Sequence, residues 1–184
     1  KSASTAGLPQ RHTSILYPCL EIYRGREAAG MATDSLFTML MTKKPGNFSE
    51  QIVYEDDKVM AFLDKFPMVQ GHTLVVPKKQ IERVHEMDEE TAAAVGVALM
   101  KVAAKVVKAT GSDTYNVMNN SGPDAGQEVP HVHFHIIPRC KDDYTSSWAA
   151  SIEKTRHELN KKPEKLPDDA FSGALKDLRD RIRD

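Results

Sequence analysis

Three histidines alternate with apolar residues in one short segment, His131-Val132-His133-Phe134-His135-Ile136-Ile137. Side chains of a β-strand point alternately to opposite faces, so a strand here places all three imidazoles on one face and the apolar side chains on the other. An imidazole can act as a nucleophile, transfer a proton near neutral pH or bind a metal ion. Three such rings on one face favour a reactive or ligand-binding strand over a purely structural one.

Repulsion between the rings limits the chemistry that they offer. If all three histidines were charged, each would lower the pKa of the others, so we expect at least one neutral ring at pH 7. Such a ring has a free nitrogen for nucleophilic attack or for metal ligation. One ion shared by all three is disfavoured, because His131 and His135 would lie about 13 Å apart on an extended strand. A metal site with Glu128 or Asp124 is the alternative, although the chain has no Cys-x-x-Cys pair and no HExxH motif.

A polar loop, 119–127, comes directly before the histidines and is rich in glycine and amide side chains. Glycines let a ligand approach the backbone closely, and exposed backbone N–H groups in turns bind anions. The loop therefore predicts a phosphate-binding wall beside the three rings.

Short strands and one long helix must position these groups. Alternating apolar runs bounded by turn residues predict strands at 51–54, 59–64, 73–76, 115–118 and 131–137, the last ending at Pro138. Helices are expected at 35–42 with Asp34 as cap, at 88–109 between Asp88 and Gly111, at 146–159 and at 169–181. Strands and helices do not alternate regularly, which indicates an α+β fold with a mainly antiparallel sheet.

The composition argues against nucleic acid and membranes as partners. The 184 residues carry a net charge of −1, which gives no global field for nucleic acid or an anionic membrane. No apolar run approaches the roughly 18 residues that span a bilayer. Cys19 and Cys140 are the only cysteines, and so few fit a reducing compartment such as the cytoplasm. Residues 1–30 differ from the rest, and Met31 resembles a natural start, so 1–30 is interpreted as an extension with weak features of a transit peptide.

Several separated motifs together resemble the histidine-triad (HIT) family of nucleotide-binding proteins. The triad segment matches that family's signature of three histidines alternating with apolar residues. The other matching segments occur in family order: Asp34-Ser35-Leu36-Phe37, Val53-Tyr54-Glu55-Asp56-Asp57, Ala61-Phe62-Leu63-Asp64, Gly71-His72-Thr73-Leu74-Val75-Val76-Pro77-Lys78-Lys79 and Gly126-Gln127. The resemblance covers about Asp34 to Arg139.

The resemblance implies a role for each matching residue. His133 corresponds to the nucleophile that attacks the α-phosphate, and His72 to a fourth histidine that supports the triad. His131 and His135 correspond to flanking partners that orient the nucleophile ring, bind phosphate oxygens or help to protonate the leaving group. Asp64 corresponds to the carboxylate that accepts the ribose hydroxyls. The resemblance also implies an apolar slot for the base, formed by Leu36, Phe37 and Phe62. On the phosphate side it implies contacts from Asn120, Gly126, Gln127 and Glu128.

Three departures from the family pattern affect these expectations. Many microbial relatives carry a zinc-binding Cys-x-x-Cys near the first helix, where this chain has Ser35 and Thr38, so no structural zinc is expected. Glu128 stands where a Ser or Thr often assists the leaving group, which leaves the preferred leaving group open. Pro138-Arg139 follows the triad in place of a Gly/Trp/Pro tail, as in Fhit-like and bacterial branches.

The resemblance thus implies a HIT-like domain over 31–140, followed by a helical extension over 141–184. One long helix and a five-stranded antiparallel sheet are expected, with the sheet continued across a homodimer. The expected function is hydrolysis of purine nucleoside 5′-monophosphoramidates, chiefly of adenosine, through a nucleotidyl-histidine intermediate without a cofactor. Hydrolysis of dinucleoside polyphosphates, or nucleotide binding with little catalysis, are the alternatives.

Overall fold

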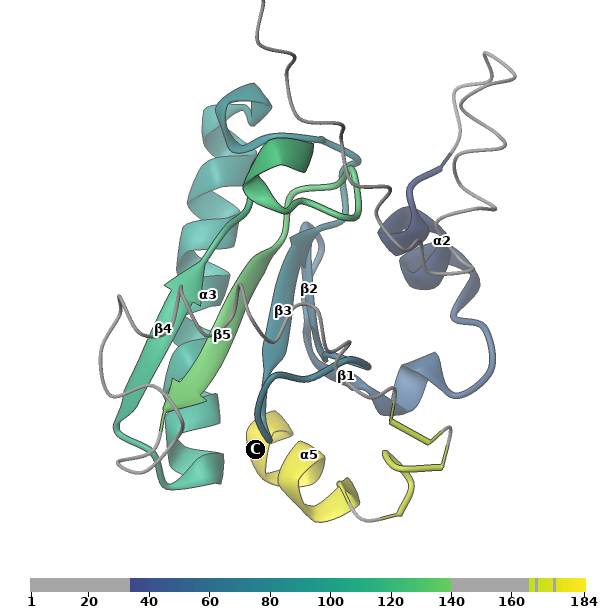
Figure 1. Cartoon of the computed structure of the whole chain (residues 1–184), viewed down its shortest axis with the longest axis vertical. Helices are drawn as coiled ribbons and strands as arrows, with labels where there is room; N and C mark the ends of the chain where they lie inside the picture. Colours follow the sequence, from purple (N-terminus) through teal and green to yellow (C-terminus); the bar gives the residue numbers. More distant parts are fainter. Residues whose placement is uncertain (1–33, 140–165, 168, 174) are drawn as a thin grey trace, which may run out of the picture. The chain divides into compact units, whose positions relative to one another are not determined.

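The computed structural model describes residues 34–139, 166–167, 169–173 and 175–184. Within this part of the chain, five strands form one antiparallel sheet in the order β1-β2-β3-β5-β4 (Figure 1). Their bounds are β1 Ile52–Glu55, β2 Val59–Leu63, β3 Thr73–Pro77, β4 Thr114–Met118 and β5 Phe134–Arg139. The expected α+β fold with a five-stranded antiparallel sheet is confirmed. The extension at 1–30 and the helix expected at 146–159 lie outside the described residues.

Among the described residues, three α-helices accompany the sheet: α2 Leu36–Lys43, α3 Glu89–Thr110 and α5 Lys176–Arg183. Short 3-10 turns occupy Phe48–Glu50, Val84–Glu86 and Pro123–Ala125. The long helix α3 begins and ends as the sequence predicts. The Asp88 carboxylate accepts the Thr91 amide at 2.7 Å, and Gly111 ends the helix in a left-handed conformation.

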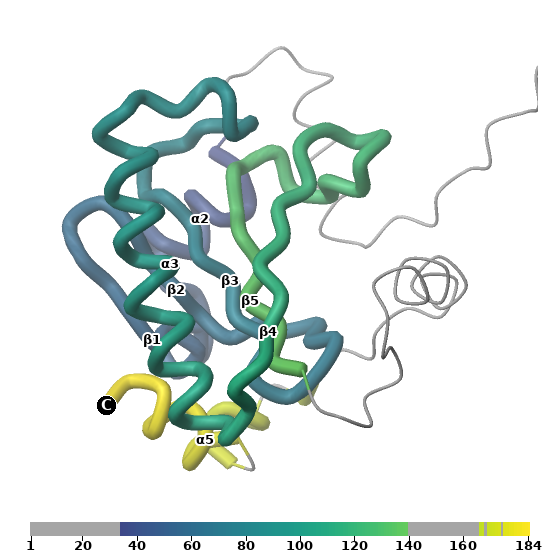
Figure 2. The backbone as a smooth tube through the Cα atoms, turned by 90° about the vertical axis from the view of Figure 1, so that its left-hand side faces the viewer, coloured from purple at the N-terminus to yellow at the C-terminus, as the bar shows by residue number. Residues whose placement is uncertain are grey.

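Both faces of the sheet centre are covered, so every residue of β2 and β3 is buried. Alternate residues enter two different cores. Val59, Ala61 and Val75 pack with α3 and α5 on one face, while Met60 and Phe62 pack with α2 on the other face. Figure 2 shows how α3 runs along the sheet. Since helices cover both faces, the central strands are continuous apolar runs.

Helix α2 starts one residue later than expected, and its cap is Ser35, not Asp34. The Ser35 hydroxyl accepts the Thr38 amide at 3.1 Å, which makes Leu36 the first helical residue. This shift directs Ser35 into the interior of the domain, where its side chain is fully buried.

Strand β5 differs from the predicted strand at both ends. The Val132 amide donates to the Ile81 carbonyl at 2.7 Å, so the backbone before Phe134 pairs outside the sheet. At the other end β5 runs through Pro138 to Arg139, so the expectation that Pro138 ends it is wrong. Beyond Ile136, β5 pairs only with β4, and a proline needs no amide on the side without a partner strand.

The last helix begins at Lys176 and not at Asp169, because a single turn closed by Gly173 precedes it. Leu178 and Ile182 of α5, together with Phe171 from the turn before it, complete the core, and all three are at most 3% exposed. The buried Arg179 donates to the carbonyls of Glu50 and Phe171 at 3.2 and 2.9 Å. The end of the chain is therefore an integral part of the fold.

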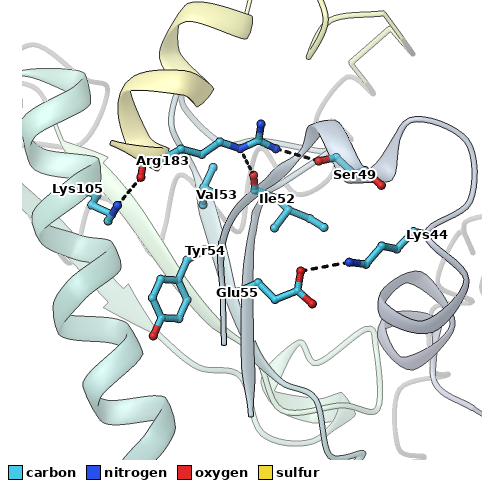
Figure 3. Close-up of a pocket in the computed structure, with 8 residues that line it drawn as sticks. All are labelled: Lys44, Ser49, Ile52, Val53, Tyr54, Glu55, Lys105 and Arg183. Atoms are coloured by element: carbon cyan, nitrogen blue, oxygen red, sulfur yellow. Dashed lines mark hydrogen bonds and ion pairs between the residues drawn. The ribbon is translucent and has the colours of Figure 1, made fainter. Parts of the chain in front are cut away.

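A cavity of about 520 Å³ runs along the edge strand β1 (Figure 3). Arg183 donates across it to the carbonyls of Ser49 and Ile52, and Lys44 pairs with Glu55 at 3.1 Å. The Arg183 bonds fasten α5 to β1 and to the turn before it, and the Lys44 pair fastens the end of α2 to β1. None of the histidines of the triad lines this cavity.

Candidate active site

The three triad histidines gather on the sheet face that α2 covers. His135 lies in β5 opposite Leu74 of β3, a member of the α2 core. The Phe37 ring of α2 contacts the rings of His131 and His133, with centroid distances of 6.0 and 5.1 Å. The His133 and His135 rings are 5.0 Å apart. The structure thus brings the triad together on one face, although only His135 belongs to a regular strand.

His133 is held with one nitrogen bound and the other unbound. Its Nδ1–H donates to the backbone carbonyl of His131 at 2.7 Å. A carbonyl can only accept, so the proton of the neutral ring is on Nδ1 and the lone pair is on Nε2. Burial lowers the pKa of His133, which keeps this ring neutral at pH 7. Within the described residues Nε2 has no hydrogen-bond partner, so it is the nitrogen available for nucleophilic attack.

His131 is fully buried, and both of its ring nitrogens are bound within the protein. Nε2–H donates to the Pro77 carbonyl at 2.8 Å, and Nδ1 accepts the Ser35 hydroxyl at 2.6 Å. The ring therefore has no nitrogen left for a phosphate oxygen or a leaving group. Of the roles that the resemblance implies for His131, the geometry supports orientation of His133, which runs through the His131 carbonyl.

His72 and His135 form a directed pair. The Met68 amide donates to Nδ1 of His72 at 3.2 Å, so the neutral His72 ring carries its proton on Nε2. That Nε2–H donates to Nδ1 of His135 at 2.9 Å. His135 must then carry its own proton on Nε2, a buried atom without a partner among the described residues. An unpaired buried donor beside a nucleophile is suited to a developing negative charge.

Burial keeps this histidine pair neutral. It lowers the pKa of His72 to about 4, with the charge of His133 as a smaller cause. Burial also lowers the pKa of His135 to about 3, assisted by the charge of His72. At neutral pH both rings therefore act as hydrogen-bond donors and not as cations.

The Asp64 carboxyl lies beside the His72 ring and interacts with a second carboxyl, that of Glu128. Asp64 accepts the Phe66 amide at 2.9 Å through Oδ1, and its Oδ2 lies 3.4 Å from Nδ1 of His72. Burial raises the pKa of Asp64. Partial burial, and then the charge of Asp64, raise the pKa of Glu128, so these two carboxyls are electrostatically coupled. Oδ2 of Asp64 keeps lone pairs that the Phe66 amide does not use.

The residues expected to hold the base belong mainly to the α2 core. Phe37 and Phe62 are 5% and 3% exposed and pack edge to face at 5.6 Å. Leu36 is half-buried at the first turn of α2. Phe37 contacts two triad rings directly, whereas Phe62 supports it from β2. A base bound beside Phe37 would thus lie next to His133.

Two amide side chains in the loop before the triad, those of Gln127 and Asn120, differ in their hydrogen bonds. Gln127 accepts the Gly122 amide at 2.6 Å and donates to the Glu82 carbonyl at 2.8 Å, so its side chain closes the loop. Gly126 adopts a φ of +85°, which favours glycine. Asn120, beside Gly126, hydrogen-bonds to none of the described residues, so its amide is uncommitted there.

A metal ion has one candidate position in the described part of the chain. Ligand atoms of Asp64, His72 and His135 lie within 4.8 Å of one another. An ion there would have to break the hydrogen bond between the two imidazoles. Near α2, the hydroxyls of Ser35 and Thr38 stand in place of thiolates, and hydroxyls are poor zinc ligands. The expected absence of metal stays a prediction.

Asn119 and Ser35 hydrogen-bond to triad residues, and Gln80 bonds to Ser35, although none of the three was predicted to contact the triad. Asn119 donates to the His133 carbonyl at 2.8 Å, and Ser35 bonds to His131 and, through its amide, to Gln80. A serine before an apolar helix is an N-cap signal, but its partner lies 96 positions away. Only the fold brings these residues together.

Comparisons with known proteins agree with this geometry. The family model for the HIT domain matches residues 46–142, more than half of the chain. An uncharacterized HIT-like protein of Methanocaldococcus jannaschii is 50% identical over 98 residues, which are 53% of this chain and 75% of that protein. An adenosine 5′-monophosphoramidase of Schizosaccharomyces pombe is 44% identical over 85 residues, which are 46% of this chain and 61% of that enzyme.

Solved structures show the same architecture. A Hit-like protein of Bartonella henselae, described as involved in cell-cycle regulation, superposes with a TM-score of 0.61 at 32% identity, covering 82% of this chain and 95% of that one. None of the helices in the described residues is long and apolar enough to cross a membrane. On the family model, the relatives and the shared fold, this chain belongs to the HIT domain family.

Proposed function

We propose that this protein hydrolyses purine nucleoside 5′-monophosphoramidates, chiefly of adenosine, through a covalent nucleotidyl-His133 intermediate. One observation carries the proposal. The Nδ1–H of a buried, neutral His133 is bound to the His131 carbonyl at 2.7 Å, which leaves the Nε2 lone pair for attack on phosphorus. The family membership and the phosphoramidase from S. pombe support the same reaction class.

In the first step Nε2 of His133 attacks the α-phosphorus and a new P–N bond forms. The P–N bond to the leaving amine breaks, and the amine leaves with a proton. His135, 5.0 Å away between ring centroids, directs its unpaired Nε2–H into the site. That donor stabilises negative charge on a phosphate oxygen. The leaving amine is basic and takes its proton from solvent, because the neutral His135 ring, whose Nδ1 accepts the His72 Nε2–H, has no acidic proton to give.

In the second step water attacks phosphorus, the P–N bond to His133 breaks, and the nucleoside monophosphate is released. The attacking water releases its proton to solvent, which balances the proton that the amine took up in the first step. His72 keeps His135 in a fixed orientation through the 2.9 Å bond between their rings. Splitting the reaction in two avoids direct attack of water on an unactivated phosphoramidate.

The other side of the site would select the nucleoside. Asp64 accepts the ribose hydroxyls, Phe37 and Leu36 contact the base, and Asn120 contacts phosphate. The uncommitted Oδ2 of Asp64 and the uncommitted amide of Asn120 support these assignments. The carboxyl of Glu128, coupled to Asp64, favours a neutral or cationic leaving group over a polyphosphate.

Paired turnover assays test this proposal. The substrates are an AMP–amine phosphoramidate and a diadenosine polyphosphate, each assayed with the wild-type protein and the His133→Asn variant. We expect the wild type to prefer the phosphoramidate and the variant to bind AMP without turning over either substrate. Faster cleavage of the polyphosphate would favour the dinucleoside hydrolase, and binding without turnover by the wild type would favour a scaffold protein.

We further propose a homodimer formed along β4. This strand lies at one edge of the sheet, and its Tyr115 and Val117 side chains are 43% and 46% exposed. Apolar side chains on an open strand edge suit pairing with a second copy, which would continue the sheet. Light scattering should give twice the chain mass for the wild type and a monomer for Val117→Lys. A monomeric wild type would contradict the dimer.

A further inference from the structure

Three polar side chains outside the triad converge on His131. Gln80 Oε1 accepts the Ser35 amide and the Thr38 hydroxyl, both at 2.7 Å. The Ser35 hydroxyl lies 2.6 Å from Nδ1 of His131 and 3.0 Å from the Thr38 hydroxyl. Ser35 and His131 are both 0% exposed. This cluster joins the start of α2 to the segment after β3 and to the triad.

The direction of each hydrogen bond in the cluster is fixed by the acceptors. Nε2 of His131 faces the Pro77 carbonyl and must donate, so Nδ1 of the neutral ring must accept. The single proton of the Ser35 hydroxyl therefore points at Nδ1, while a lone pair of its oxygen accepts the Thr38 amide. The Thr38 hydroxyl directs its own proton to Gln80. The Thr38 hydroxyl also lies 3.4 Å from Nδ1 of His131, but Ser35 at 2.6 Å is the closer donor.

We propose that Ser35, supported by Thr38 and Gln80, is a positioning residue for the nucleophile. Its hydroxyl holds His131 as the Nε2–H tautomer and fixes the ring, and the His131 backbone carbonyl then orients His133 through the 2.7 Å bond to Nδ1–H. The proposal rests on the proposed role of His133. It adds that a buried serine without any substrate contact sets the rate of nucleotidyl transfer.

Ser35 has two functions that substitution can separate, since its oxygen caps α2 and its proton binds His131. Glycine at an N-cap costs a helix only a few tenths of a kcal/mol, so Ser35→Gly removes the proton donor and largely keeps the helix start. Ser35→Thr keeps both functions. Thr42→Ala is the matched control, because it removes a hydroxyl bond of α2, to the Thr38 carbonyl at 2.8 Å, far from His131.

Single-turnover assays with the AMP–amine phosphoramidate test the proposal. We expect Ser35→Gly to slow formation of nucleotidyl-His133 by at least about tenfold, the loss of one oriented hydrogen bond, with KM within about twofold of the wild type. Ser35→Thr should restore the rate, and Thr42→Ala should leave it unchanged. A folded Ser35→Gly variant with a wild-type rate overturns the proposal.

A spectroscopic readout covers the case in which Ser35→Gly does not fold. Imidazole nitrogen-15 shifts of the wild-type protein distinguish a protonated from an unprotonated nitrogen. We expect His131 to show an unprotonated Nδ1 and a protonated Nε2 at neutral pH, and an Nδ1–H tautomer or an imidazolium overturns the proposal. If the wild type turns over no phosphoramidate while His131 has the expected tautomer, the proposed function fails and the hydrogen-bond assignment stands.

Discussion

His72 makes the stability of this protein depend on pH below neutral. The ring is 3% exposed, and burial lowers its pKa from 6.5 to about 4. The unfolded chain therefore binds a proton at His72 below about pH 6.5, whereas the folded protein does so only below about pH 4. The stability that His72 contributes is complete above pH 6.5 and is lost as the pH falls through this window. At pH 5 the loss for this one residue is about 2 kcal/mol.

Urea unfolding of the wild type and of His72→Asn at about pH 7.5 and pH 5 measures this contribution. The variant should be less stable than the wild type at both pH values, because it loses the bonds to Met68 and His135. From about pH 7.5 to pH 5, however, the free energy of unfolding of the variant should fall by about 2 kcal/mol less than that of the wild type. Titrating groups other than His72 and His135 are common to both proteins and cancel in the difference. Removing His72 also relieves His135, whose pKa it lowers, which adds to the difference.

The exposed His85 provides the control for this comparison, because its ring is solvated in the folded and the unfolded protein. His85→Asn should follow the wild type at both pH values. An equal fall in stability for the wild type and His72→Asn would refute the argument that a buried neutral His72 opposes protonation.

Three further substitutions test separate parts of the structure. Gly71 has a φ of +87°, and an alanine Cβ there would lie 2.8 Å from Thr110 Cγ2. Gly71→Ala should therefore lower the free energy of unfolding in urea by about 1–3 kcal/mol and slow turnover by displacing His72. Unchanged stability and turnover would contradict this. Arg179→Met leaves two carbonyls without a donor and should cost about 2 kcal/mol; a neutral effect would show that α5 is not fastened there. Glu128→Ser should raise dinucleoside polyphosphate turnover about fivefold relative to phosphoramidate, the effect of about 1 kcal/mol of repulsion; an unchanged ratio would place Glu128 away from the leaving group.

The sequence predicts most helices and strands of this fold, because the residues that start and end each of them lie within or next to that element. Helix α3 carries its own cap at Asp88 and its own stop at Gly111, and both lie where the sequence predicts them. The first residues of the triad segment are different. The Val132 amide bonds to Ile81, a contact between distant segments, and an alternating pattern alone cannot show that the strand begins only at Phe134.

The candidate site could be predicted in its residues but not in their roles. The spacing of the triad indicates three rings on one face, yet it treats His131 and His135 as equivalent neighbours of His133. The structure separates them, because the nitrogens of His131 are taken by Ser35 and Pro77 while Nε2 of His135 stays unpaired. Such differences depend on which distant groups meet each nitrogen, and no local pattern records that.

Trapping the covalent intermediate tests the central claim most directly. The protein is mixed with an AMP–amine phosphoramidate labelled in the nucleotide, quenched within the first turnover at alkaline pH, where a P–N bond to histidine survives, and digested for mass spectrometry. The geometry of His133 predicts one AMP per chain on the peptide that carries 131–135, attached to His133 and absent from His133→Asn. Turnover with AMP on another residue, or with no covalent AMP at any time, would contradict the assignment of His133 as the nucleophile.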